Sequence, residues 1–177
     1  MAKKKGEAIQ TILAEIIKGL SSPDHEEQDA ARNKLDDLRK KRFSTSDGIA
    51  FLRGAMQKFP PRKLDWMDSS GDLICAAAAA PKPEYISVIR DCFVEYSRKG
   101  KVEALYLLSL LPEREAASAY MDLLQEHARS MQIQRLALRQ IQNNPRHADI
   151  FFPRILEYTN IEEFRWEIQL LLLYLSI

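Results

Sequence analysis

The sequence predicts an all-α fold, a right-handed superhelical stack of about five antiparallel helical hairpins. Apolar residues recur every three or four positions along nearly the whole chain, which is the spacing of one helix face. No segment alternates apolar and polar residues for more than four or five positions, so we expect no sheet. Glycine and proline are few, at 6 and 8 of 177 residues, which argues against a turn-rich β domain.

The first hairpin is predicted over residues 6–41. Its first helix carries one clean apolar stripe, formed by Ile9, Ile12, Leu13, Ile16, Ile17 and Leu20. Ser22 is the expected N-cap of the second helix, with Pro23 in its first turn. The second helix, 23–41, is highly charged, and its apolar stripe is thin: Ala30, Ala31, Leu35 and Leu38.

The second hairpin is predicted over residues 46–80. Its first helix begins near Ser46 and is expected to run to Phe59, because Pro60 disfavours helical geometry in the residue before it. Its second helix is short and opens at Ser70-Gly71-Asp72.

Three further hairpins are predicted over 83–111, 112–144 and 145–177. Pro83, Pro112 and Pro145 mark the starts of their first helices. Their second helices are expected to begin near Lys101, Met131 and Ile161. Gly100 is the expected C-terminal stop of one first helix, since glycine adopts the left-handed conformation cheaply.

These three hairpins align with a period of 31 residues. The alignment places chemically similar residues in shared columns, for example Ile89, Tyr120 and Phe151, and Phe93, Leu124 and Ile155. We therefore expect residues 1–177 to form a single helical repeat domain.

The succession of helical hairpins resembles the HEAT and armadillo class of α-solenoids. The resemblance covers the architecture of the whole chain, while the period of 31 is shorter than the ~40 residues typical of HEAT repeats. It implies a protein that holds another macromolecule, and no functional residues of a family carry over.

No catalytic, cofactor or metal constellation stands out in the sequence. The three histidines, His25, His127 and His147, lack metal-ligand spacing, and Cys75 and Cys92 are expected to be buried free thiols. Asp65, Asp68 and Asp72 could act as paired carboxylates or bind a hard cation; the alternative is that they complement a helix dipole. We therefore expect no enzyme, no cofactor and no metal.

The charge is split along the chain. Residues 1–64 carry a net charge of +5 and residues 65–177 a net charge of −4, within an overall +1. A basic patch is predicted at Arg39, Lys40, Lys41 and Arg42. It could contact phosphate, or it could simply be the solvated, cation-favouring end of a helix.

A partner-binding surface is predicted on the second helices near the C-terminus. Arg135, Arg139, Arg165 and Trp166 fall opposite the apolar columns, and Arg and Trp are enriched at interface hot spots. The alternative for Trp166 is that it packs under a neighbouring helix.

The segment Leu170–Ile177 is apolar on all sides, whereas a terminal repeat usually presents a polar outer face. It could be wedged between neighbouring helices, be covered by a partner or a second copy, or mark a cut from a longer chain. No apolar run reaches the ~20 residues of a membrane span, and we expect a cytoplasmic protein.

Together these features predict a non-enzymatic binding module, of the adaptor or immunity type, whose partner is another protein. The alternative hypothesis is a nucleic-acid-binding HEAT-like protein that uses the basic N-terminal face.

Overall fold

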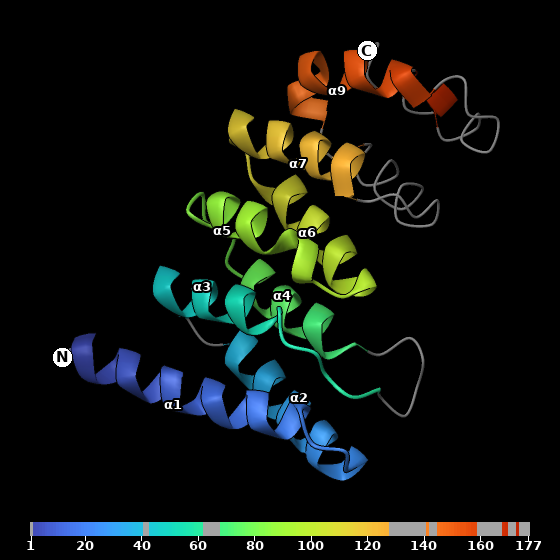
Figure 1. The fold of residues 1–177 in the computed structure, drawn as a ribbon. Coiled ribbons are helices and arrows are strands. Elements are labelled where there is room, and N and C mark those ends of the chain that lie inside the picture. The colour runs from blue at the N-terminus through green and yellow to red at the C-terminus, as the bar shows by residue number, and fades with distance from the viewer. Residues whose placement is uncertain are drawn as a thin grey trace. The chain divides into compact units, whose positions relative to one another are not determined.

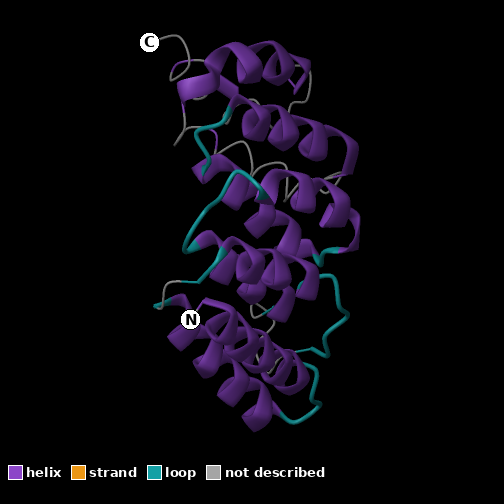
Figure 2. Ribbon diagram, turned by 90° about the vertical axis from the view of Figure 1, so that its left-hand side faces the viewer, coloured by secondary structure: helices purple, strands orange, loops and turns teal. Residues whose placement is uncertain are grey.

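The computed structural model describes residues 2–40, 43–61, 68–127, 141, 145–158, 168–169 and 173, and, among these, the side chains from residue 10 onward except those of residues 127, 145 and 158. In these residues the chain is all-α, which confirms the predicted class, and no strand occurs among them (Figure 2). None of the described helices is both long and apolar enough to cross a membrane. The chain divides into two compact units, Met1–Ala104 and Leu105–Ile177, and each is described by itself.

The first unit contains five complete α-helices and the start of a sixth among its described residues. They are α1 (Ala2–Leu20), α2 (His25–Arg39), α3 (Thr45–Gly54), α4 (Ser69–Ala78), α5 (Tyr85–Cys92) and α6 (Arg98–Leu110), with a 3₁₀ turn at Phe93–Glu95. Two antiparallel hairpins form, because α1 packs on α2 and α3 packs on α4. First helices of neighbouring hairpins pack against each other, and so do second helices: α3 contacts both α1 and α5, and α2 contacts α4 (Figure 1).

The core of the first unit follows the predicted apolar stripes. Leu13, Ile16 and Leu20 of α1 are buried, as are the α2 residues Ala31, Leu35 and Leu38. Ala30 is exposed, so it does not belong to the α2 stripe as expected.

The second unit continues from Leu105 within α6 and contains α7 (Arg114–His127) and α9 (Ala148–Ile155). A 3₁₀ turn at Pro145–His147 precedes α9, and another at Leu156–Tyr158 follows it. The two helices pack together through the edge-to-face rings of Tyr120 and Phe151, whose centroids lie 6.1 Å apart. Arg154 Nη1 also donates to Asp122 Oδ1 at 2.7 Å.

Two of the aligned columns are buried in the structure. Ile89, Tyr120 and Phe151 are each at most 2% exposed, and so are Phe93, Leu124 and Ile155. The second helices expected near Met131 and Ile161 lie outside the described residues. The repeat and the superhelical stack therefore stay predictions.

The start of α2 differs from the expected one. Asp24 is its N-cap and accepts a hydrogen bond from Glu26 N, while Pro23 lies before the cap. Ser22 instead receives the backbone N–H of Asp24 on its hydroxyl. Its carbonyl accepts from Gln28 Nε2 at 2.8 Å, which satisfies a buried side chain. The prediction of Ser22 as the cap was wrong because an aspartate two residues later satisfies the helix N–H groups directly.

The helix α3 ends at Gly54 rather than at Phe59. Tight i→i+3 hydrogen bonds, from Met56 N to Arg53 O and from Gln57 N to Gly54 O, close the last turn before the prolines are reached. Its start agrees with the prediction: Ser44 caps it and forms a capping box with Asp47.

Gly100 lies inside the first turn of α6, so the prediction that it stops a helix was wrong. No described glycine has a positive φ, so the left-handed geometry on which that prediction rested does not occur. The reason for glycine is space: a Cβ at this position would lie 2.6 Å from the Ser70 hydroxyl oxygen of α4. Gly100 therefore permits the close contact of α4 and α6.

We predict that Gly100→Ala destabilises the protein by about 1–3 kcal/mol, because the added methyl group overpacks the contact. It should displace the Ser70 hydroxyl, which donates to Ala55 O at 2.6 Å. The free energy of unfolding in urea measures the effect. Ser70→Ala alone should cost about 1 kcal/mol for the lost hydrogen bond. The double variant should lose clearly less than the sum of the two single variants, and strict additivity would refute the contact.

Candidate functional site

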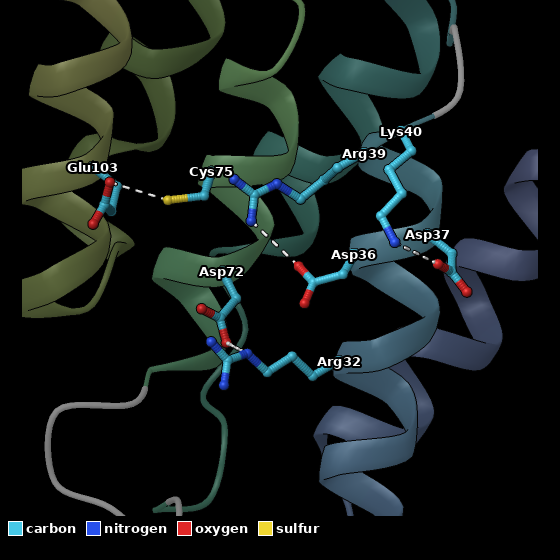
Figure 3. A network of polar contacts seen from close by, with 8 residues as sticks. All are labelled: Arg32, Asp36, Asp37, Arg39, Lys40, Asp72, Cys75 and Glu103. Atoms are coloured by element: carbon cyan, nitrogen blue, oxygen red, sulfur yellow. Dashed lines mark hydrogen bonds and ion pairs between the residues drawn. The ribbon is translucent and has the colours of Figure 1, made fainter.

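Polar side chains from three successive second helices lie on one side of the first unit. They are Arg32, Asp36 and Arg39 on α2, Asp72 and Cys75 on α4, and Glu103 on α6, and we call this set the polar face (Figure 3). The spacing i, i+4, i+7 puts the three α2 residues on one side of that helix. The packing of α2 on α4 then brings them beside the α4 residues.

Ion pairs hold the long side chains of the polar face. Arg32 Nε lies 3.6 Å from Asp72 Oδ2 and joins α2 to α4, with side chains 31% and 15% exposed. Arg39 Nη1 lies 3.3 Å from Asp36 Oδ1 within α2. The arginine and aspartate side chains of both pairs therefore stay partly exposed to solvent.

Cys75 and Glu103 join α4 to α6 at the next position of the polar face. The half-buried Cys75 thiol donates to Glu103 Oε2 at 3.1 Å. Burial, and then this hydrogen bond to a carboxylate, raise the pKa of Cys75 from 9.0 to about 12, although Arg39 opposes the shift. The thiol therefore stays protonated at neutral pH and acts as a hydrogen-bond donor.

The predicted basic patch is divided by the helix. Arg39 faces α4, whereas Lys40 lies on the other side of α2 and its Nζ is 3.0 Å from Asp37 Oδ1 (Figure 3). Each of the two cations is thus paired with an aspartate of its own helix. Lys41 and Arg42 lie outside the described residues.

The predicted carboxylate cluster is separated in the same way. Asp68 is the N-cap of α4, and its Oδ1 accepts from Gly71 N at 2.8 Å, as the helix-dipole alternative requires. Asp72 pairs with Arg32, and Asp65 lies outside the described residues.

The caps of α4 and α6 are linked through Asp68. The Ser97 hydroxyl donates to Asp68 Oδ1 at 2.9 Å and accepts from Gly100 N at 2.9 Å. One carboxylate therefore stabilises the N-termini of two neighbouring second helices.

The other residues proposed from the sequence lie elsewhere or outside the described part. Arg135, Arg139, Arg165 and Trp166 are not described, nor is Leu170–Ile177 apart from Leu173, which is 63% exposed. His25 Nδ1 lies 3.3 Å from Gln28 Oε1, and His147 Nε2 lies 2.8 Å from Pro112 O. Both histidine rings therefore contact polar groups of the fold itself, His25 within its own helix and His147 at Pro112. Across the part of the chain that is described, His, Cys, Asp and Glu side chains form no group of three suited to a metal ion.

Only the α2 residues of the polar face could have been predicted from the sequence. The spacing of Arg32, Asp36 and Arg39 is visible in it, beside the stripe of the buried Leu35. Their cross-helix neighbours Asp72 and Glu103 are far away in sequence, and only the packing of the hairpins brings them close.

We predict that Glu103→Gln speeds alkylation of Cys75 by iodoacetamide at pH 8 severalfold, because it removes the carboxylate that helps to raise the thiol pKa. Peptide mass spectrometry measures the rate at each thiol. Glu84→Gln, an exposed change on a residue that makes no cap bond, is the control and should leave the rate unchanged. A wild-type Cys75 that reacts as fast as it does in urea would refute the buried, bonded thiol.

We also predict that Ser97→Ala costs about 1–2 kcal/mol of unfolding free energy, because it removes the acceptor of Gly100 N and a donor to Asp68. Ser87→Ala is the control, since Ser87 makes only a 3.3 Å exposed bond to Glu84 O. If both variants change the free energy of unfolding by no more than the about 0.5 kcal/mol typical of surface substitutions, the linked caps do not contribute to stability.

Comparisons of the chain with known protein families, with curated proteins and with solved structures found no match. No function is therefore transferred to this chain from a relative.

Proposed function

We propose that the chain is a protein-binding module built as a HEAT-like α-solenoid, and that the polar face of α2, α4 and α6 binds the partner. The like-on-like packing of its hairpins supports the architecture, since first helices contact first helices and α2 contacts α4. Solenoids of this kind use such rows of helices as binding surfaces.

The single observation that carries the proposal is the row of paired charges on consecutive second helices. Arg32, Arg39 and their aspartates present both signs of charge, which favours a polar protein surface of mixed charge. Their ion pairs already restrict the long side chains, so less side-chain entropy is lost when a partner binds.

The chemistry of the face supports binding rather than catalysis. A thiol with a pKa near 12 is a poor nucleophile at neutral pH, since the thiolate is the reactive form. The carboxylates of Asp36 and Asp72 are held by arginines. An adaptor or immunity-type role, in which the chain holds one other protein, fits these side chains.

The test uses two double variants of α2 with the same change in charge. Arg32→Gln/Arg39→Gln neutralises the polar face, and Lys34→Gln/Lys40→Gln neutralises the side of α2 whose cations pair with Glu15 and Asp37. We expect the first double variant to weaken binding of the partner by at least about tenfold, or 1.4 kcal/mol. The second should change the dissociation constant by no more than about twofold.

The partner is identified by quantitative affinity capture from the source cell, and the dissociation constant is then measured with purified proteins. Circular dichroism shows that both variants fold. Equal binding by both variants would contradict the proposal. So would recovery of duplex nucleic acid in place of a protein, with binding that falls steeply with salt.

A further inference from the structure

Two side chains of opposite charge flank Cys75 on the polar face. Glu103 Oε2 on α6 accepts the hydrogen bond of the thiol at 3.1 Å. The guanidinium group of Arg39 on α2 points toward the thiol from the other side (Figure 3). Both charges act on the same sulfur, because Glu103 raises the pKa of Cys75 and Arg39 lowers it. Three successive second helices thus place a cation, a neutral thiol and an anion in a row.

Both charged groups keep unused hydrogen-bonding capacity. Arg39 uses Nη1, which lies 3.3 Å from Asp36 Oδ1, and its other N–H groups have no partner among the described residues. Its side chain is 43% exposed. Glu103 uses Oε2 for the thiol, and its Oε1 accepts no hydrogen bond from any residue that the structure describes. A ligand over Cys75 therefore finds donors on one side and an acceptor on the other.

The two opposite charges disfavour a charged ligand group at this place. A carboxylate that accepts from Arg39 would lie close to Glu103, and like charges repel each other. An ammonium or guanidinium group that donates to Glu103 would be repelled by Arg39 in the same way. This argument depends on the two charges that act on the thiol, and not on a net charge of the surface. A neutral group that both donates and accepts meets neither repulsion.

A side-chain carboxamide has the geometry that the two groups require. Its C=O and NH₂ lie side by side at one end of a planar group, so one amide can accept from Arg39 while it donates to Glu103. The N–H and C=O of a trans main-chain peptide point in opposite directions, which does not suit two groups on one surface. A hydroxyl group donates and accepts through a single oxygen atom, so it spans a shorter distance.

We propose that an asparagine or glutamine side chain of the partner protein docks over Cys75 and links Arg39 to Glu103. The inference rests on the proposed function and names the chemical group by which the partner recognises the polar face. Each of the two hydrogen bonds has one charged member, and such bonds are stronger than those between two neutral groups.

The test compares two changes at Glu103 of the full-length chain, with the partner protein that affinity capture recovers. Glu103→Gln removes the charge but keeps a carbonyl oxygen as acceptor, whereas Glu103→Leu removes both. For a carboxamide we expect Glu103→Gln to weaken binding about threefold and Glu103→Leu about thirtyfold. For a cationic group the two losses would be alike, since both changes remove the charge pair. The dissociation constant of the purified proteins measures each effect.

Glu84→Gln is the matched control, because it neutralises an exposed carboxylate that is not part of the polar face, and it should leave the dissociation constant unchanged. Urea unfolding shows whether each variant is folded. Equal losses from Glu103→Gln and Glu103→Leu would overturn the inference. So would a Glu103→Leu variant that binds within about twofold of the wild type.

The two proposals fail separately. If capture of the partner depends on Arg32 and Arg39 but the two Glu103 variants do not differ as expected, only the carboxamide assignment is wrong. If no protein is captured, or if capture is insensitive to Arg32 and Arg39, the proposed function is wrong, and so is the inference that rests on it.

Discussion

The close contact between α4 and α6 sets the geometry on which the polar face depends. At Gly100 the backbone of α6 approaches the Ser70 hydroxyl so closely that a Cβ would lie 2.6 Å from its oxygen and would have to displace it. Asp68 and Ser97 then join the N-terminal caps of the two helices by hydrogen bonds. Because the helices are fixed at this end, Cys75 and Glu103 meet one turn further along.

The forces that hold the first unit together differ from those that arrange its surface. Fully buried side chains such as Ile16, Leu35 and Leu52 each contribute about 1.5–3 kcal/mol through removal from water. A partly exposed ion pair such as that of Arg39 and Asp36 contributes at most about 1 kcal/mol. The apolar stripes therefore determine the fold, and the charged residues can serve a partner at little cost to stability.

Periodicity in the sequence predicted which segments are helical, because burial of one helix face imposes a pattern on neighbouring residues. The helix ends were harder to predict from the sequence, because they depend on which of several nearby polar side chains caps the helix. At α2 the cap is Asp24 rather than Ser22. Gly100 was misassigned because its role is to make room for Ser70, a contact between residues thirty positions apart. The polar face could not be predicted for the same reason, since Arg32 and Asp72 become neighbours only through hairpin packing.

The central claim is that the partner lies against the side of α2 that faces α4. Asp36 and Asp37 are adjacent in sequence, but Asp36 lies on the polar face and Asp37 on the other side of the helix (Figure 3). A photoreactive benzoylphenylalanine placed at either position therefore probes one side only. The account predicts a covalent cross-link to the partner from position 36 and none from position 37. Equal cross-linking from both positions, or cross-linking from position 37 alone, would contradict it.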